Sequence, residues 1–467
     1  MLLSRVRIDL PHHLDELLLD ALRTAPRRYR MPPLPGNAEA AVASGADVAL
    51  AFAIAGACLA KERRLPPSAQ SQEMFTCALA QLIRQALATD GGDPAFQAIV
   101  LQAQETAVHE HVQLRRARAA DQRAVRTATN SIAHPGKLRR MPAGAVREAL
   151  ARLHALAAAG SWAALAQAVE RALAQGLTEQ PELRAPLEAM RSSPALTRLQ
   201  RGDELLRLDA VRRYQALCER RGPLAGSHAA AAKGRTSARE GERAEQAAAA
   251  AFGKLAELLN RHREGAAGYR VVRSLRTPRG FPGTANKAKE EWDAALLHGE
   301  PGAAAELILL AEIKASPAAA MSDFPRLLRG LRRLAHASAE TAYAFASADG
   351  EARFLGASLR QLEPVGHLLP SHVIYCCSAT AEPPPQVLSA ASKAVLLAEP
   401  ASLAFALQVA RGKSPPHSAL APVWNELQTA PRLRAALHQY ETAAKARAAM
   451  LHPDDLVAAV ERSLDQS

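Results

Sequence analysis

The sequence predicts an all-α N-terminal region followed by a mixed α+β or α/β region, and two observations lead to this fold class. Between about residues 10 and 220, Ala, Leu, Gln and Arg recur with the period of a helix, and Pro or Gly stand only at breaks. From about residue 241 one helical segment is followed by short apolar runs typical of strands. The expected order of this second part is α-β-β-β-α-β.

Length and composition allow two or three domains, each with its own core, because the chain has 467 residues and is 48% hydrophobic. A disordered tail is excluded on the same grounds. We predict an all-helical region over 1–220, a linker over 221–240, an α/β domain over 241–400 and a helical tail over 401–467. Within the first region, the Pro- and Gly-containing segment 133–144 predicts a break between two groups of helices.

The α/β domain is expected to contain two core helices and several short strands. Its first helix covers about 242–260, and its Arg-rich second helix covers about 324–336. Four strand-like runs surround the second helix, "YRVVRSL" (269–275), "EWDAALLHG" (291–299), "AELILLAEIKA" (305–315) and "HVIYCC" (372–377). After a Pro-rich hinge at 381–386, "KAVLLAEP" (393–400) predicts one more strand before the helical tail.

Charge and cysteine usage indicate the partner and the compartment. The net charge of +12 and the pI near 9.8 favour a polyanionic partner. The five cysteines show no CxxC spacing, which fits a reduced compartment. The N-terminus lacks the apolar core of a signal peptide, and the longest apolar stretch, 48–60, is too short to cross a bilayer. We therefore expect a cytoplasmic protein with no membrane segment.

The best candidate for chemistry is the end of the strand-like run 305–315. Side chains two apart in a strand share a face, so Glu312 and Lys314 project together. Asp293 begins the preceding strand, and the Gly-rich segment 298–304 can close a hairpin that brings Asp293 close to Glu312. Two carboxylates and an ammonium group would then converge. The simpler alternative is a strand-end ion pair near solvent, with Asp293 as an ordinary acid beside a turn.

Such a group suits phosphodiester hydrolysis. Mg²⁺ or Mn²⁺ prefers carboxylate oxygens, and a bound divalent ion makes water a usable nucleophile near neutral pH. A neighbouring lysine can orient that water or stabilise the charge of the transition state. Asp293 and Glu312 are therefore expected to bind the metal, and Lys314 to assist the attack.

These residues resemble the signature of the PD-(D/E)xK nuclease superfamily, an acid on the second core strand followed by (D/E)-x-K on the third, matched by Asp293 and "EIK" at 312–314. The resemblance covers about 239–379 and implies a restriction-endonuclease-like αβββαβ domain. Many members add a glutamate on the first core helix. Glu245 in "EGERAEQ" is similar to it and Glu242 is its rival, whereas the alternative for Glu245 is a solvated helix face.

Basic residues surround the predicted site. They stand before and along the first strand and on the helix after the third, at Arg261, Arg263, Arg270, Arg273, Arg276, Arg279, Arg326, Arg329 and Arg333. Arginine is a frequent phosphate ligand, so this cluster suits a groove for a nucleic-acid backbone, DNA in the first place. A solubilising surface is the alternative.

The leading hypothesis is a metal-dependent nuclease, and two other classes stay open. A non-catalytic nucleic-acid or protein-interaction module would keep the same fold and lack cleavage. A sugar-phosphate synthase of the 3-deoxy-D-arabino-heptulosonate 7-phosphate type ranks lowest, because its barrel needs eight strand–helix alternations and 1–220 shows almost no strands. The N-terminal helices are a candidate surface for a protein partner or a homo-oligomer.

Overall fold

The computed structural model describes residues 12–174, 181–222, 228–262, 267–300, 302–380 and 385–465. The chain forms two compact units. The sheet unit consists of Met1–Gln81, Ala225–Leu396 and His417–Ser467, and the helical unit consists of Leu82–Leu224 and Leu397–Pro416. This division differs from the predicted ranges, because both ends of the chain belong to the sheet unit.

The helical unit is built from α5 to α12 and α17. The bounds are α5 Pro94–Gln104, α6 Thr106–Ala133, α7 Pro135–Leu138, α8 Ala145–Ala159, α9 Trp162–Ala174, α10 Pro181–Arg191, α11 Pro194–Leu205, α12 Asp209–Arg220 and α17 Pro400–Ala410. The predicted break at 133–144 contains the short helix α7 and connects α6 to α8 within one helical group. Ile132, Leu138 and Leu150, which flank or lie within it, are buried in one core cluster.

The sheet unit contains a seven-stranded mixed sheet in the order β5-β4-β1-β2-β3-β6-β7. The strands are β1 Gly268–Arg276, β2 Glu291–Gly299, β3 Glu306–Lys314, β4 Ala342–Ser347, β5 Gly350–Leu355, β6 Val373–Cys377 and β7 Met450–Leu451. β1, β2 and β3 pair antiparallel, whereas β6 is parallel to β3 and to β7. The coarse prediction, a helical N-terminal region followed by a mixed α/β region, is confirmed. A mixed sheet with two ends is not the parallel barrel of the synthase alternative.

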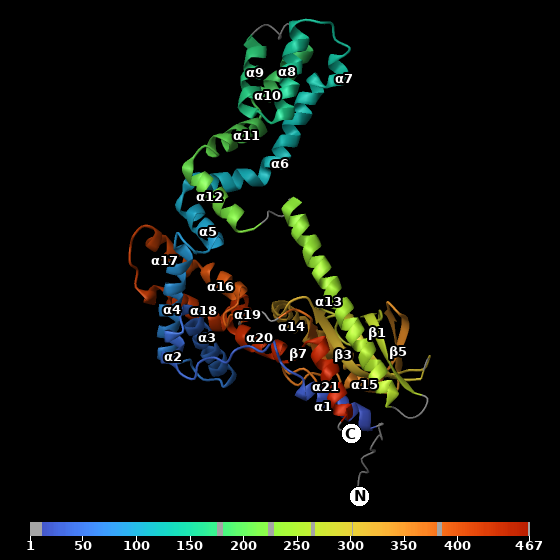
Figure 1. The fold of residues 1–467 in the computed structure, drawn as a ribbon. Helices are drawn as coiled ribbons and strands as arrows, with labels where there is room; N and C mark the ends of the chain where they lie inside the picture. Colours follow the sequence, from blue (N-terminus) through green and yellow to red (C-terminus); the bar gives the residue numbers. More distant parts are fainter. Residues whose placement is uncertain are drawn as a thin grey trace. The chain divides into compact units, whose positions relative to one another are not determined.

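Helices from the N-terminal, central and C-terminal parts of the chain complete the sheet unit. They are α1 His12–Thr24, α2 Ala38–Ala43, α3 Ala46–Glu62, α4 Ala69–Leu87 (which runs on into the helical unit), α13 His228–Arg261, α14 Pro317–Leu334, α15 Gly356–Arg360, α16 Ala390–Leu397, α18 Ala421–Thr429, α19 Arg434–Leu437, α20 Gln439–Ala448 and α21 Pro453–Asp465, with the short 3₁₀ turns η2 His417–Leu420 and η3 Pro431–Leu433. α1, α13 and α21 lie against the same face of the sheet (Figure 1).

Three local predictions need correction. The run 393–400 was predicted as a strand, but its first residues lie in α16: Ser389 caps this helix through the N–H of Ser392, and the buried Ser392 and Leu396 are one helical turn apart. The predicted linker 221–240 is already helical from His228. The hairpin β4–β5 was not predicted, although Asp349–Gly350 between alternating runs is a hairpin signal.

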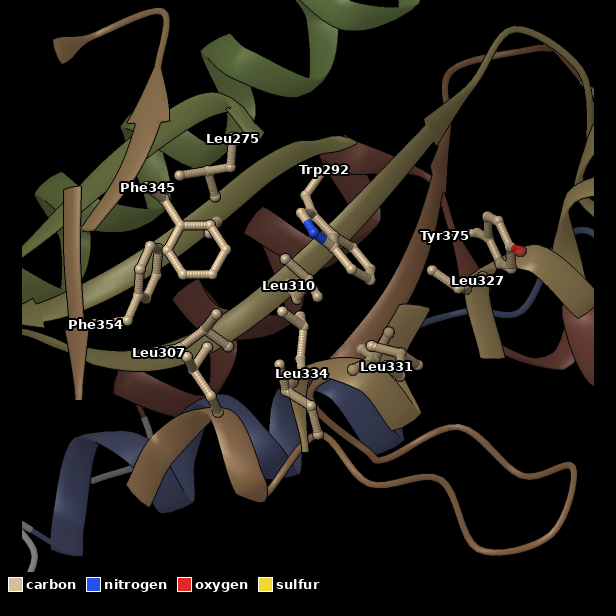
Figure 2. Packing of buried hydrophobic residues seen from close by; sticks show 14 of the residues in the cluster. Leu275, Trp292, Leu307, Leu310, Leu327, Leu331, Leu334, Phe345, Phe354 and Tyr375 are labelled. Atoms are coloured by element: carbon tan, nitrogen blue, oxygen red, sulfur yellow. The ribbon is translucent and has the colours of Figure 1, made fainter. Parts of the chain in front are cut away.

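Each face of the sheet has its own core. On one face, Trp292 and Leu310 pack against Leu327 and Leu331 of α14 (Figure 2). On the other face, strand residues such as Leu309 pack against α1, α13 and α21. Full burial of one such side chain stabilises the fold by about 1.5–3 kcal/mol. Alternate side chains of β3 therefore pack into different cores, on opposite sides of the sheet.

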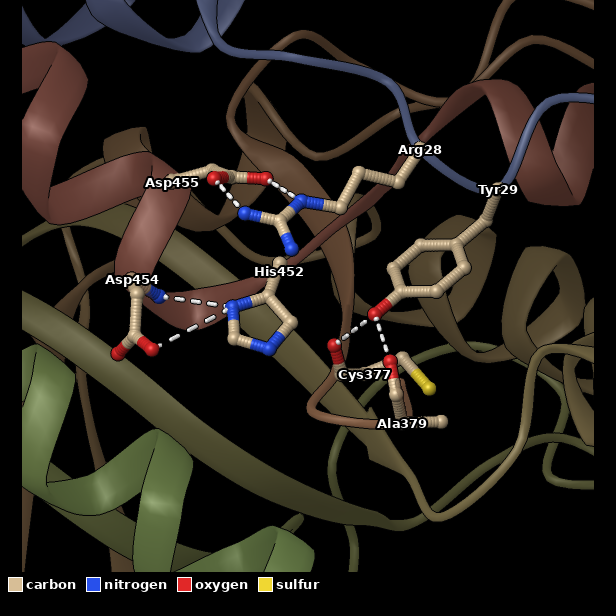
Figure 3. Close-up of polar contacts among 7 residues, drawn as sticks. All are labelled: Arg28, Tyr29, Cys377, Ala379, His452, Asp454 and Asp455. Carbon is tan, nitrogen blue, oxygen red and sulfur yellow. Dashed lines mark hydrogen bonds and ion pairs between the residues drawn. The ribbon is translucent and has the colours of Figure 1, made fainter. Parts of the chain in front are cut away.

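The chain after α1 is attached to the end of β6. The buried Tyr29 hydroxyl lies 2.8 Å from the carbonyl oxygen of Cys377 and 2.7 Å from that of Ala379, to which it donates (Figure 3). The Arg28 guanidinium forms a two-pronged ion pair with Asp455 of α21. These contacts explain why an N-terminal segment belongs to the sheet unit.

Among the described residues, no single helix combines the length and the apolar composition needed to span a membrane. The consecutive helices α16 and α17 meet that test only together, as a bent pair.

Candidate active site

β2 and β3 position the two predicted carboxylates side by side. The antiparallel strands pair with Ala294 opposite Ala311. Asp293 and Glu312, one residue beyond this pair on each strand, are therefore neighbours across the pair. The Asp293 carboxylate accepts a hydrogen bond of 2.7 Å from the backbone N–H of Ile313, directly after Glu312. The structure therefore brings together the acid and the strand end that the sequence singled out.

Glu312 is the centre of the cluster and is only 3% exposed. Its Oε1 atom lies 2.5 Å from Nζ of Lys314 and 2.7 Å from Nζ of Lys289. Its Oε2 atom is buried and has no hydrogen-bond partner among the described atoms. An unpaired buried carboxylate oxygen costs free energy unless a ligand satisfies it, so this atom marks the place where a cation would be stabilised.

Electrostatics in the cluster set the charge of Glu312. Burial, followed by the negative charge of Asp293, raises the pKa of Glu312 to about 7, although Lys289 and Lys314 oppose the shift. Burial alone would lower the pKa of Lys314, but the charge and hydrogen bond of Glu312 raise it. Lys314 is therefore charged at neutral pH, whereas Glu312 is close to half-protonated.

Three residues that the sequence reading missed complete the cluster. Lys289 precedes β2 and is 6% exposed. Asp323 of α14 lies 3.3 Å from Nζ of Lys314, and Tyr375 of β6 pairs with Glu312 in the parallel register. Burial and the charge of Asp323 raise the pKa of Tyr375, so its hydroxyl stays protonated. The sequence offered only weak signals for Lys289 and Asp323. Lys289 stands an even number of residues before Asp293, as residues on one face of a strand do, and Asp323 is the first acidic residue after the "EIK" motif.

A glycine allows α14 to approach this cluster closely. A Cβ atom added at Gly330 would lie 2.8 Å from Cβ of Lys289 and 2.8 Å from Cη2 of Trp292. A larger residue would push the helix away from the segment that carries Lys289. Gly330 therefore permits the close approach of α14 to the segment that carries Lys289.

The helix glutamates do not join the site. Glu245 and its rival Glu242 are exposed on α13. α13 packs through Ala248 and Phe252 on the face of the sheet opposite to the one that Glu312 shares with Leu310. The structure therefore places Glu245 on a solvated face of α13, apart from Asp293 and Glu312.

The predicted arginines separate into paired and unpaired groups. Arg333 is 6% exposed, lies 2.5 Å from Glu290 and donates to the Phe281 carbonyl, so its guanidinium is bonded within the fold. The others that bond within the fold are Arg273 with Asp349, Arg276 with Glu291, Arg270 with the carbonyl of Glu300, and Arg329 with the carbonyl of Lys287. Arg261, Arg279 and Arg326 are exposed and form no ion pair with a described residue, and Arg263 lies outside the described residues.

The pocket beside β1 and the β4–β5 hairpin has mixed charge. Its volume is about 600 Å³, and its lining includes Arg276 and Arg279 together with Glu290, Glu291 and Glu351. Three carboxylates facing two guanidinium groups repel a polyanion as much as they attract it. The lining of this pocket therefore gives no net positive charge that would favour a phosphate backbone.

Comparisons of the chain with models of protein families, with curated proteins and with solved structures gave no match. The chemistry of the site is therefore inferred from its geometry.

Proposed function

We propose that the sheet unit carries a divalent-metal-dependent phosphodiesterase site of nuclease type, with Mg²⁺ or Mn²⁺ as the metal and a nucleic acid, DNA in the first place, as the substrate. The observation that supports this proposal is the free Oε2 atom of Glu312. It is a buried carboxylate oxygen that has no hydrogen-bond partner within the described part of the chain, and Asp293 is on the neighbouring strand. In the restriction-endonuclease-like arrangement that the resemblance implies, these are the positions of the metal ligands.

The donor set fits a hard cation. Asp293 and Glu312 would hold the metal through carboxylate oxygens, which Mg²⁺ and Mn²⁺ prefer, and Asp323 offers a third carboxylate at the same end of the sheet. When bound, the ion supplies Lewis-acid charge that polarises the phosphodiester and the attacking water. The cation would also offset the repulsion between Asp293 and Glu312, which contributes to the raised pKa of Glu312.

In this proposal, Lys314 is the residue that acts on the substrate. Its side chain is 15% exposed, whereas Glu312 below it is almost fully buried. Lys314 is held by Glu312 and Asp323, so its Nζ is fixed rather than free to rotate. A fixed ammonium group at the rim of the site can orient a nucleophile and stabilise the charge that develops on the phosphate.

A non-catalytic nucleic-acid or protein-interaction module is the second candidate, and one observation favours it. Lys289 adds a second ammonium group to Oε1 of Glu312, so the site carries more positive charge than the (D/E)-x-K motif alone provides. In this alternative the cluster is a buried ion-pair network that stabilises the end of the hairpin.

The deciding experiment is incubation of the purified protein with linear, nicked, branched and single-stranded nucleic acids, with and without Mg²⁺ or Mn²⁺. We expect metal-dependent cleavage by the wild type and none by Asp293→Asn or Lys314→Ala. Lys233→Ala, which removes an exposed lysine of α13, is the matched control and should cleave normally. Cleavage retained in Lys314→Ala would contradict its role, and metal-independent binding without cleavage would favour the module.

A further inference from the structure

A second cluster of metal-binding residue types lies in the sheet unit. Cys58, Glu62, His438 and Glu441 each offer one ligand atom, and these four atoms all lie within 4.8 Å of one another. Sγ of Cys58 is 3.1 Å from Nδ1 of His438 and 3.8 Å from Oε2 of Glu441. The third distance, from Nδ1 of His438 to Oε2 of Glu441, is 3.9 Å.

Helical spacing arranges the four side chains in two pairs. Cys58 and Glu62 are four apart on α3, so they share one face of that helix. His438 immediately precedes α20 and Glu441 lies in its first turn, three residues later. The two pairs are 380 residues apart in the chain, and only the packing of α3 against α19 and α20 brings them together.

We propose that Cys58, Glu62, His438 and Glu441 bind one Zn²⁺ ion. Zinc is held tetrahedrally by sulfur, nitrogen and oxygen at about 2.0–2.3 Å, which places neighbouring ligand atoms about 3.3–3.8 Å apart. The three distances among the ligand atoms of Cys58, His438 and Glu441 are close to these ligand-to-ligand distances. The side chains therefore need only small movements to surround an ion. A thiolate and an imidazole select Zn²⁺ over Mg²⁺, in contrast to the all-oxygen cluster around Glu312.

The neighbouring lysines leave the ligand atoms accessible. Lys445 pairs with Oε1 of Glu441, so Oε2 remains directed at Cys58 and His438. Nζ of Lys61 donates to the carbonyl oxygen of Gln428 at 2.6 Å. Cys58 itself is 6% exposed. This burial would protect its thiolate from oxidants when the thiolate is bound to an ion.

Four protein ligands without an open position are typical of a structural zinc site. The ion would link α3, near the start of the chain, to α20, near its end. This role is independent of the proposed nuclease activity, because none of the four residues belongs to the cluster around Glu312.

The test uses the full-length protein, stripped with a chelator and reloaded with Zn²⁺ or Co²⁺ alone. We expect one Zn²⁺ per chain by elemental analysis and a thiolate-to-cobalt charge-transfer band in the absorption spectrum. Cys58→Ser should abolish the band and weaken Zn²⁺ binding by more than the roughly 10- to 100-fold that results from losing a group that only hydrogen-bonds to a metal ligand. Cys77→Ser, at an exposed cysteine of α4, should leave both unchanged.

A wild-type protein without stoichiometric Zn²⁺, or one whose cobalt complex lacks the thiolate band, would overturn the proposal. The same holds if Cys58→Ser retains the band. If Cys58→Ser does not fold, as judged by circular dichroism, His438→Gln serves instead, because that side chain is 32% exposed and less important for packing. This variant should keep the thiolate band, shifted in position, and lose Zn²⁺ affinity; unchanged affinity would contradict the site.

Discussion

The two candidate metal sites of the sheet unit differ in how the chain assembles them. Around Glu312, the motif residues come from one hairpin, and Asp293 meets the strand end through a single antiparallel register. Around Cys58, the ligands come from helices 380 residues apart. The first site can be proposed from spacing alone, whereas the second has no signature in the sequence.

The two sites also differ in their surroundings. Glu312 is buried beneath two ammonium groups and offers only oxygen, whereas Glu441 is 35% exposed and stands beside a thiol and an imidazole. Hard ions suit the first set and Zn²⁺ suits the second. The sheet unit therefore presents two chemically different groups of ligand atoms, and variants in each group test whether they act separately.

The largest effect is expected from Glu312→Gln, which removes the ionisable ligand while keeping its size. Metal-dependent cleavage should fall by about 10³-fold or more, because several kcal/mol of Lewis-acid stabilisation are lost with the metal. The cobalt band at Cys58 should persist. Cys58→Ser should show the opposite pattern in the same two assays. If each variant impaired both readouts, the two centres would not be separate.

The second prediction concerns pH, since burial raises the pKa of Glu312 from its ordinary value of 4.5 to about 7. Between these values the folded protein keeps a proton that the unfolded chain releases. The contribution of Glu312 to the free energy of unfolding is therefore fully present below pH 4.5 and lost as the pH rises to 7, by about 3 kcal/mol in total.

Urea unfolding of the metal-free protein between pH 4.5 and 8 measures this change. Glu312→Gln is the reference, because glutamine does not titrate. The difference between the two stability curves should decline with rising pH; a flat difference would show that the folded-state pKa of Glu312 is normal.

The third prediction tests how α14 is fitted to the hard-cation site. Gly330→Ala should destabilise the protein by about 1–2 kcal/mol, because overpacking against Lys289 and Trp292 outweighs the gain in helix propensity. Gly253→Ala on α13 is the matched control, since open space surrounds its Cβ position, and it should stabilise by up to about 1 kcal/mol. Equal effects would contradict the close approach at Gly330. Neither variant should change the cobalt spectrum.

The fourth prediction, with a smaller effect than the first three, concerns Tyr29→Phe and its control Arg28→Met. Loss of the hydroxyl leaves the carbonyl oxygens of Cys377 and Ala379 without this donor and should lower the free energy of unfolding by about 1 kcal/mol. Urea unfolding measures the loss, and Arg28→Met, which breaks a more exposed ion pair, should cost less. No change in Tyr29→Phe would mean that the segment joining α1 to α3, and with it Cys58, is held by other contacts.

Local patterns account for the part of the fold that could be predicted. The strands β1, β2, β3 and β6 and the helices α13 and α14 follow from period-2 and helical alternation. The hairpin β4–β5 was missed although its turn signal is present, and the run 393–400 was mistaken for a strand because a short apolar segment fits both periods. That the described N-terminal residues 12–81 belong to the sheet unit could not be predicted, since it depends on contacts such as that of Tyr29 with Cys377.

The sequence by itself determined that Glu312 and Lys314 share one face of a strand and that a turn can bring Asp293 beside them, because strand alternation and hairpin register are properties of neighbouring residues. Only the tertiary structure decided which other groups meet them. It added Lys289 and Asp323, sent Glu245 to the solvated side of α13, neutralised Arg333 with Glu290, and joined Cys58 to His438. These outcomes depend on how helices and strands pack over long sequence separations, where no fixed spacing relates one residue to its partner.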